Sequence, residues 1–281
     1  MTTPTSPVVE PAPPSAAETA PVVVFDNVSI TFDVKPVLEN LSFSVAPGET
    51  RIILGPAGCG KSVLMKLANG LLCPDTGSIT IFGQDITQMR ERDLYPFRSR
   101  IGMVFQESAL FDSLSVEDNV AYRLHEEKVP AEEAHTRVVE ALKFVELEQA
   151  IAKFPSELSG GMRRRVSIAR AVITKPDLIL YDSPTGGLDP ITSTTIIELV
   201  IKQRDVSHTT SLLITHRIQD AFTLAMNRYS PDRNHHMERI PNDGIDPNTK
   251  FLVLNEGKIV FDGTTEELVT TTDPWLKEFV S

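Results

Sequence analysis

Two short segments carry residues suited to binding a nucleotide. Residues 55–62 read GPAGCGKS, which matches G-x-x-x-x-G-K-[ST] between a predicted strand and a predicted helix. Glycines let the backbone N–H groups of such a loop surround phosphate oxygens, while Lys61 would reach the β- and γ-phosphates and Ser62 would bind Mg²⁺. Residues 178–189 read LILYDSPTGGLD, in which an apolar run ends at Asp182. The Asp182 carboxylate is the candidate second ligand for magnesium. Together the segments predict a site for a nucleoside triphosphate and Mg²⁺.

These segments need a sheet to position them. Helical periodicity predicts a helix directly after the phosphate loop that stops near Pro74, and a helix N-cap at Ser115 with Asp118 three residues on. Strands and helices alternate, which predicts an α/β fold with a mainly parallel core sheet. The predicted strands are 22–32, 38–45, 50–55, 77–86, 100–106, 177–182, 210–216 and 251–261. The further predicted helices are 130–145, 161–173, 191–203 and 217–226.

Composition excludes several classes of protein. The net charge is -11 and no Lys- or Arg-rich run is present, so no nucleic-acid partner is expected. Cys59 and Cys73 suggest neither a disulfide framework nor a zinc site, which indicates a reducing cytoplasm. No apolar run is long enough to span a bilayer. Residues 1–21, rich in Pro, Ala, Thr and Ser, predict a disordered tail without secretory features. A role at a membrane would therefore require a partner.

The segment LSGGM at 158–162, followed by RRRVSIARA, gives a specific resemblance. It lies about a hundred residues after the phosphate loop and just before the aspartate strand, and it resembles the signature of ATP-binding cassette (ABC) proteins. The resemblance covers residues 22–281. It implies a P-loop NTPase cassette with a mainly parallel core sheet, an antiparallel β subdomain from the N-terminal strands, and a helical subdomain at about 107–175.

The resemblance also implies roles for single residues. Phe32 would stack on adenine, Gln106 would contact Mg²⁺ and the attacking water, and His216 would contact the γ-phosphate. Each could alone be structural, Phe32 as a core residue and His216 as a buried histidine, but their shared order supports the family. The implied catalytic residues are Gln106, Asp182, Ser183 and His216. The implied magnesium ligands are Ser62, Gln106 and Asp182. The implied nucleotide-binding residues are Phe32, Gly55, Pro56, Ala57, Gly58, Cys59, Gly60, Lys61, Ser62, Val63, Ser159, Gly160, Gly161 and Asp189.

One chain cannot complete the site that the resemblance implies. In ABC proteins two cassettes close head to tail, and the signature loop of one supplies Ser159 and the N–H groups of Gly160 and Gly161 to the γ-phosphate held by the other. Free N–H groups at a helix start suit an anion. A second cassette is therefore expected, as a homodimer or a heterodimer.

Two features indicate which subfamily of ABC proteins the chain resembles. Met162 in the signature and the stretch FQESALFDSLSVEDNVAYRL are similar to the ATPases of MCE-type lipid transporters, the Mla and mycobacterial Mce systems. The resemblance implies an integral membrane permease, which would dock near Leu110, Phe111 and Leu114, and an MCE-domain lipid-binding protein. The chain would lie peripherally on the cytoplasmic face of the inner membrane. The alternatives are an importer ATPase for another substrate and a soluble ATP-gated switch, as in DNA-repair or ribosome-associated ABC proteins.

Ser183 departs from the family pattern, which has a glutamate after the strand aspartate to polarise water. A serine hydroxyl is no base near neutral pH, and a positioned base contributes about 10²–10⁴-fold in rate. Three explanations remain open: a slow ATPase, the degenerate half of a heterodimer, or a substitution that traps the ATP-bound state.

Two further stretches carry weaker signals. The polar stretch at about 229–249 predicts a surface insertion, in which His235 and His236 form a minor candidate metal site. Positive charge is unfavourable at a helix start, where Arg163, Arg164 and Arg165 lie. Arg165 is expected to pair with an acidic group, and the other two to be solvated.

Overall fold

The computed structural model describes residues 20–33, 35–231, 237–242 and 244–280. The predicted tail, apart from residues 20–21, and the histidines at 235 and 236 lie outside these ranges. The strands are β1 (Val23–Phe32), β2 (Lys35–Val45), β3 (Thr50–Leu54), β4 (Thr76–Ile81), β5 (Gln84–Asp85), β6 (Ile101–Val104), β7 (Leu178–Asp182), β8 (Thr210–Ile214), β9 (Asn227–Tyr229), β10 (Met237–Arg239), β11 (Thr249–Asn255) and β12 (Lys258–Thr264). The α-helices are α1 (Lys61–Ala68), α2 (Glu91–Arg98), α3 (Val116–Glu126), α4 (Ala131–Phe144), α5 (Gly160–Val172), α6 (Pro190–Ser207), α7 (Ile218–Met226), α8 (Thr265–Val269) and α9 (Pro274–Val280).

The core sheet has the strand order β12-β11-β3-β8-β7-β6, and every neighbouring pair from β11 to β6 is parallel. Only the edge strand β12 pairs antiparallel among these described strands. Strand β7 shows why a strand that is buried on both faces has a continuous apolar sequence. Leu178 and Leu180 join one hydrophobic cluster, whereas Ile179 and Tyr181 join the cluster on the opposite face. The predicted mainly parallel α/β sheet is confirmed.

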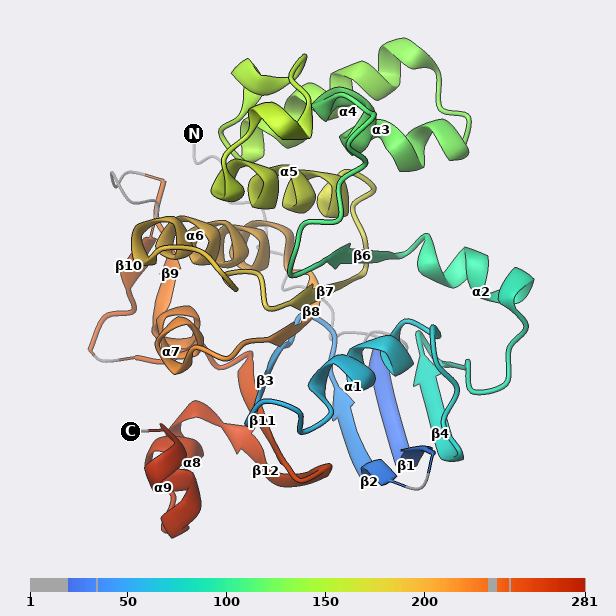
Figure 1. Ribbon diagram of the computed structural model, residues 1–281. Helices are drawn as coiled ribbons and strands as arrows, with labels where there is room; N and C mark the ends of the chain where they lie inside the picture. The colour runs from blue at the N-terminus through green and yellow to red at the C-terminus, as the bar shows by residue number, and fades with distance from the viewer. Residues whose placement is uncertain (1–19, 34, 232–236, 243, 281) are drawn as a thin grey trace, which may run out of the picture.

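An antiparallel sheet of order β2-β1-β4-β5 forms the second layer. Its inward side chains, with Phe25 stacked on Phe43, share a hydrophobic cluster with α1 and with one face of the core sheet. Figure 1 shows β1, β2 and β4 beside α1, at the end of the molecule opposite the layer of α3, α4 and α5. The expected antiparallel subdomain and helical subdomain are thus both present.

The helical subdomain packs on the other face of the core sheet. Helix α3 begins as predicted, because the Ser115 hydroxyl accepts a hydrogen bond of 3.0 Å from the Asp118 N–H. Helices α3, α4 and α5 contribute apolar side chains to the same cluster as α6 and α7. Sequence periodicity did not reveal α2, which is only eight residues long and contains Pro96.

Other elements differ from the prediction in extent. Helix α1 ends at Ala68 rather than near Pro74, because Gly70 takes a left-handed φ of 62° just after it. The predicted strands at 77–86 and 251–261 are each a hairpin, turning at Phe82–Gly83 and Glu256–Gly257. The polar insertion carries the hairpin β9–β10, which packs on α6 and is joined by the Arg228–Glu238 ion pair of 2.7 Å.

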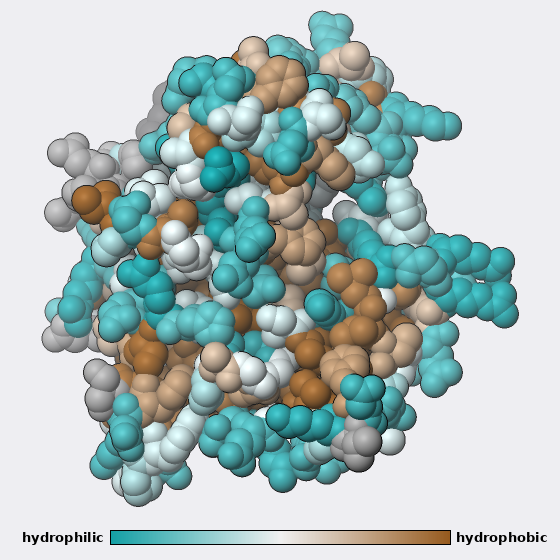
Figure 2. All heavy atoms as spheres, in the orientation of Figure 1, coloured by the Kyte–Doolittle hydropathy of each residue, from teal (hydrophilic) through white to brown (hydrophobic). Residues whose placement is uncertain are grey.

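In the described ranges no helix combines the length and the apolar character needed to cross a bilayer. On the face drawn in Figure 2, hydrophilic side chains cover most of the surface, and hydrophobic side chains gather in a patch near α1 and β4.

Candidate functional site

The candidate residues reach one edge of the core sheet because their strands are parallel. The phosphate loop follows β3, Gln106 follows β6, Asp182 ends β7 and His216 follows β8. Since parallel strands present their carboxyl ends on the same side, residues up to 161 positions apart along the chain meet there. The mutual electrostatic influence of Lys61, Asp182 and His216 confirms that they are neighbours.

The phosphate loop has the backbone that its glycines predict. Gly60 takes a φ of 103°, and a Cβ there would lie 2.4 Å from Leu38 Cδ2, so only glycine fits. The Lys61 side chain is buried and its ammonium donates to the carbonyls of Gly55 and Pro56, each at 2.7 Å. Burial lowers the pKa of Lys61, while the nearby Cys59 and Asp182 oppose that shift. The loop therefore places the Lys61 ammonium among its own carbonyls at the start of α1.

The remaining residues of the loop divide by exposure. Pro56, Ala57, Gly58 and Ser62 are exposed, as groups that face a ligand should be, whereas Cys59 is buried and Val63 packs half-buried against the cluster under α1. The Phe32 side chain is 43 % exposed at the end of β1. That exposure rules out a core role for Phe32 and leaves its ring available for stacking.

Asp182 is the acidic centre of this edge. Burial raises the pKa of its carboxyl, and the nearby His216, Lys66 and Lys61 oppose the shift. The His216 ring is exposed rather than buried, and partial desolvation together with Lys61 lowers its pKa. At neutral pH the imidazole is therefore neutral and able to accept or donate one hydrogen bond.

Ser183 occupies the position after Asp182 in a strained conformation. Its φ is 48° and its side chain is 2 % exposed. Its N–H donates to the Ile214 carbonyl at 2.9 Å, and its own carbonyl accepts from the Gly186 N–H at 2.9 Å. The hydroxyl is near enough to the Asp182 carboxylate to favour its charged form, but no hydrogen bond of good geometry joins Oγ to any described group. The turn is thus held by its backbone, not by the serine side chain.

Gln106 lies over this turn. A Cβ on Gly186 would lie 3.3 Å from Gln106 Cγ and 3.4 Å from its amide nitrogen. The side chain is exposed, so its amide is free to face a ligand. The geometry therefore brings the loop after β6 and the turn after β7 into contact.

A hydrogen-bond network that sequence reasoning missed supports the histidine loop. The Thr185 hydroxyl donates to Asp220 at 2.5 Å, and Arg217 donates to Ser193 Oγ at 2.6 Å. Arg217 also pairs with Asp220 at 3.5 Å. These bonds tie the start of α7 to the turn after β7 and to α6. No spacing in the sequence marks this network, because its members come from three separate elements.

The signature residues begin α5. The Ser159 hydroxyl caps the helix by accepting from the Met162 N–H at 3.2 Å, and Gly160 and Gly161 form its first turn. A Cβ on Gly161 would lie 2.4 Å from Thr192 Cγ2, so the glycine permits close packing against α6. Asp189 caps α6 in the same way, accepting from the Thr192 N–H at 3.0 Å.

One of the arginines at 163–165 does not behave as expected. Arg164 is not solvated: its side chain is buried, and it donates to the carbonyls of Phe105, Ser183 and Gly186 and to that of Gln106. Sequence reasoning missed it because one arginine in a run of three looks like its neighbours. The run gave no sign of which side chain faces the sheet.

The two flanking arginines take different partners. Arg163 is exposed and donates to the Leu158 carbonyl at 2.7 Å. Arg165 donates to the carbonyls of Val145 and Glu146, at 3.2 and 3.3 Å, and the Glu146 charge opposes the lowering of its pKa by burial. Glu146 is therefore an acidic neighbour of Arg165, which also binds its backbone carbonyl.

The donor set at this edge fits magnesium. Among the described residues no group of three or more His, Cys, Asp or Glu side chains could hold a metal alone. Mg²⁺ characteristically takes one or two carboxylates and completes its shell with phosphate oxygens and water. Asp182 with the Ser62 hydroxyl and the Gln106 amide supplies that kind of set, one carboxylate and two neutral oxygens.

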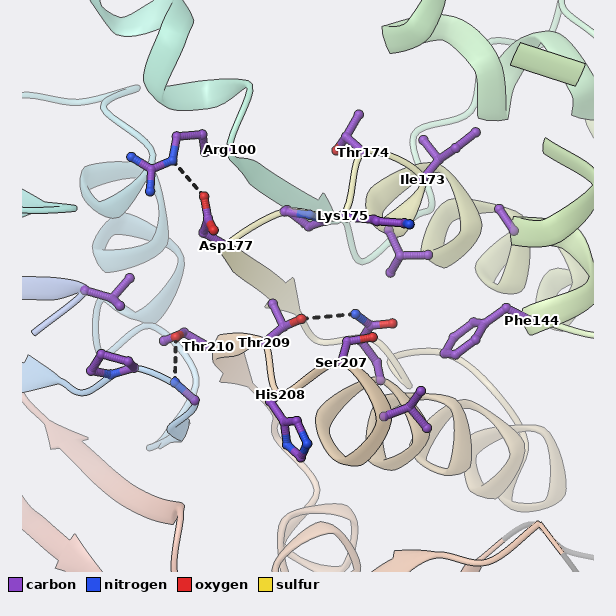
Figure 3. A pocket seen from close by; sticks show the side chains of 18 of the residues that line it. Arg100, Phe144, Ile173, Thr174, Lys175, Asp177, Ser207, His208, Thr209 and Thr210 are labelled. Atoms are coloured by element: carbon purple, nitrogen blue, oxygen red, sulfur yellow. Dashed lines mark hydrogen bonds and ion pairs between the residues drawn. The ribbon is translucent and has the colours of Figure 1, made fainter. Parts of the chain in front are cut away.

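A cavity of about 1140 Å³ lies at the opposite, amino-terminal edge of the strands. Figure 3 shows its walls, formed by residues 173–177 before β7, residues 207–209 before β8, Thr210 at the start of β8, and Phe144 of α4. Arg100 is paired to Asp177 there at 2.7 Å. None of the predicted site residues lines it.

Comparison with known proteins gives the family. Residues 38–186 match the model of the family described as ABC transporter. The chain is 34 % identical over 245 residues to the intermembrane phospholipid transport system ATP-binding protein MlaF of Haemophilus influenzae, covering 87 % of this chain and 84 % of that protein. It is 37 % identical over 264 residues to the methionine import ATP-binding protein MetN 2 of Bacillus anthracis, covering 92 % and 73 %.

Solved structures agree with the sequence relatives. A dimeric post-hydrolysis structure of the ATP-binding cassette MJ0796, bound to ADP and Pi, superposes with a TM-score of 0.72 at 28 % identity and covers 86 % of this chain and 98 % of that one. The structure of cbiO1 from Clostridium perfringens, part of the ABC transporter complex cbiONQ, gives 0.74 at 26 % identity, covering 89 % and 90 %. The chain therefore belongs to the ABC transporter family, as an ABC-type ATPase cassette and the ATP-binding subunit of a transporter.

Proposed function

We propose that this cassette powers a transporter that moves lipids across a bacterial envelope, and that Ser183 makes its ATP hydrolysis slow. The observation that carries the ATPase role is the shared edge of the core sheet, where Lys61, Asp182, Gln106 and His216 converge. Each has the chemistry that a bound Mg·ATP needs: a cation, a carboxylate, an amide and a neutral imidazole.

The residues divide the chemical work as follows. Lys61 leaves the carbonyls of its own loop and offsets the negative charge of the β- and γ-phosphates. Asp182, Ser62 and Gln106 would hold Mg²⁺, which when bound would neutralise charge developing on the phosphate oxygens. The Gln106 amide and the His216 imidazole orient the water, because Ser183 supplies no carboxylate to take its proton. Phosphoryl transfer depends chiefly on positioning and charge, so this set sustains slow turnover.

A second cassette completes the site. The solved relative MJ0796 is a dimer, which supports a dimer here. In Figure 1 α5, which begins with the signature, lies well apart from α1, which begins at the phosphate loop. The Ser159 hydroxyl and the first N–H groups of α5 are therefore proposed to bind the γ-phosphate held by the other cassette, and Asp189 to lie at the same interface.

The proposed permease-binding surface is aromatic. Tyr95, Phe105, Phe111 and Tyr122 are exposed, and the rings of Phe111 and Tyr122 lie 4.8 Å apart between centroids. The Arg123 guanidinium lies 4.5 Å from the centre of the Tyr95 ring and so links α3 to α2. Exposed aromatic side chains are typical of binding sites for a partner.

The buried Asn119 side chain shapes the loop that carries Phe111. It accepts from the Phe111 N–H at 2.8 Å and donates to the carbonyls of Phe111, Leu114 and Ser115 at 3.0–3.1 Å. Of the residues expected to dock, Phe111 is exposed, whereas Leu110 and Leu114 are half-buried. Phe111 is therefore the residue of that loop best placed to enter a partner, and the permease would hold the chain at the cytoplasmic face of the membrane.

Lipid is proposed as the substrate because LSGGM and FQ-x-x-ALF together resemble the ATPases of MCE-type systems, and because the match to MlaF spans most of both chains. An MCE-domain protein is the proposed lipid-binding partner. The second candidate is import of an amino acid, which the identity to MetN 2 supports.

The substrate test uses the cassette assembled with its permease in phospholipid vesicles. Phosphate release is measured with added phospholipid carried by an MCE-domain protein, and separately with methionine and its binding protein. Lys61→Ala complexes set the background. The lipid proposal expects stimulation by the lipid carrier alone. Stimulation by methionine without any lipid response would replace it with the importer function.

A further inference from the structure

The middle residue of the Arg163–Arg165 run is set apart by burial. The Arg164 side chain is 4 % exposed, whereas Arg163 is exposed and Arg165 half-buried. A buried guanidinium needs a specific reason, because desolvating a charge is unfavourable unless its donors are satisfied. Burial lowers the pKa of Arg164, and the charges of Asp182 and Glu107 oppose the shift, so the group stays charged.

Arg164 joins two loops of the nucleotide edge. Its Nη1 donates to the carbonyls of Phe105 at 3.2 Å and Ser183 at 3.1 Å. Its Nη2 donates to the carbonyls of Gln106 and of Gly186, the latter at 3.2 Å. Each terminal nitrogen thus takes one carbonyl from the loop after β6 and one from the turn after β7. A planar guanidinium with diverging N–H groups can make this cross-connection, whereas a single ammonium has no such fixed geometry.

Two of these carbonyls belong to Gln106, which is proposed to orient the water, and to Ser183, which stands where a base is missing. Gln106 is held through its backbone at the point where its side chain lies over Gly186, and Ser183 is the residue that lacks a base. Without a carboxylate, the rate depends on how well the remaining groups are placed. We propose that Arg164 is a positioning residue for hydrolysis, which fixes Gln106 and the turn 183–186 relative to each other. This inference rests on the proposed function in assuming that water is activated here.

The same helix holds the loop at a second point. Arg170 donates to the carbonyls of Ser108 and Ala109 at 2.9 and 2.7 Å, and both residues have left-handed φ values of 66° and 46°. Arg170 lies six residues beyond Arg164, about 9 Å along α5. Two arginines of one rigid helix therefore bind residues 105–109, and any shift of α5 must move that loop. Because Ser159 caps the N-terminus of α5, engagement of the signature by a second cassette would be transmitted to Gln106.

The test compares three variants in the full chain assembled with its permease. Arg164→Met keeps the length of the side chain and removes its donors, and Arg164→Lys keeps the charge without the fork. Arg165→Met is the matched control, because Arg165 lies on the same helix and also donates to two carbonyls but contacts neither loop. We measure kcat and KM for ATP, the Kd for Mg·ATP, thermal stability, and hydrogen exchange of amides 105–109.

Arg164→Met is expected to lower kcat by about 10–100-fold, the effect of a misplacement near 1 Å. KM and Kd should stay within about threefold, because Lys61 and its loop are untouched, and exchange at 105–109 should quicken. Arg164→Lys should have a kcat between those of Arg164→Met and wild type. If Arg164→Met does not fold, the kcat of Arg164→Lys is compared with that of wild type, and a reduced kcat is expected. Arg165→Met should change kcat by less than about twofold.

An Arg164→Met enzyme with unchanged kcat and unchanged exchange would overturn the inference, as would an equal loss of kcat in Arg165→Met. A wild type no faster than Lys61→Ala means instead that the proposed hydrolysis fails. In that case the hydrogen exchange of amides 105–109 is the remaining test. Faster exchange in Arg164→Met than in wild type supports a positioning role for Arg164, and unchanged exchange overturns it.

Discussion

Replacing Ser183 with glutamate restores the one missing proton acceptor of the site. Two features make the substitution tolerable to the backbone. The φ of 48° at Ser183 is as accessible to glutamate as to serine, since both have a Cβ. The backbone hydrogen bonds to Ile214 and from Gly186 and Arg164 do not involve the serine hydroxyl, which makes no hydrogen bond of good geometry to any described group.

The expected gain is set by general-base catalysis. A positioned base contributes about 10²–10⁴-fold, or about 2.7–5.4 kcal/mol of activation free energy. Ser183 is almost fully buried, so the longer side chain must find room beside Asp182, and the repulsion of two carboxylates raises the pKa of the new one. We therefore expect Ser183→Glu to raise kcat by about 10–10³-fold, below the full contribution.

The assay is steady-state phosphate release from the cassette assembled with its permease, at saturating Mg·ATP and pH 7. Ser183→Gln is the control, because it has the size and hydrogen-bonding capacity of glutamate without a base. The expected order is Ser183→Glu above wild type, with Ser183→Gln at or below wild type. Equal rates for Glu and Gln would refute the reasoning. So would a wild type that already turns over at about 10 s⁻¹, the ordinary enzyme median, because water would then be activated in another way.

Three further substitutions test other parts of the site. Lys61→Ala removes the cation at the start of α1 and should weaken Mg·ATP binding sharply in a titration; unchanged affinity would mean that residues 55–62 do not bind phosphate. Ser159→Arg places charge and bulk where the second cassette should close, so ATP-dependent dimers seen by light scattering should disappear, and their persistence would exclude the head-to-tail arrangement. Asn119→Ala leaves the Phe111 N–H without its side-chain acceptor and should lower the free energy of unfolding by about 1–3 kcal/mol in denaturant titrations. A loss below about 0.5 kcal/mol would show that the loop does not depend on Asn119.

The phosphate loop and the core strands could be predicted because their signals are local. Gly60 must be glycine to pass Leu38, and β7 must be apolar because both of its faces are buried. The parallel arrangement followed from the alternation of strands and helices, which then placed Gln106, Asp182 and His216 at one edge. The predicted N-cap at Ser115 is likewise a contact within four residues.

Features that depend on long-range packing could not be predicted. The burial of Arg164 is decided by which face of α5 meets the core sheet, and three consecutive arginines give no such direction. Thr185 and Asp220 meet only after β7 and β8 pair. Helix α2 could not be predicted because it is short and contains Pro96. Helix α1 is shorter than predicted because Gly70 adopts a left-handed conformation just after it.

The two unusual features of the site meet at one atom. The Ser183 carbonyl accepts a hydrogen bond from Arg164, so the residue that lacks a base is held by the arginine that also holds Gln106. A base lowers the barrier by taking a proton, whereas a rigid frame lowers it by fixing where water and phosphate meet. In phosphoryl transfer the second contribution dominates, because the bond to the attacking water is barely formed in a loose transition state and its proton need not be lost early. A cassette with a well-fixed turn and no glutamate should therefore retain hydrolysis at a reduced rate, and its remaining rate should depend on the contacts of α5 more than on any acid or base.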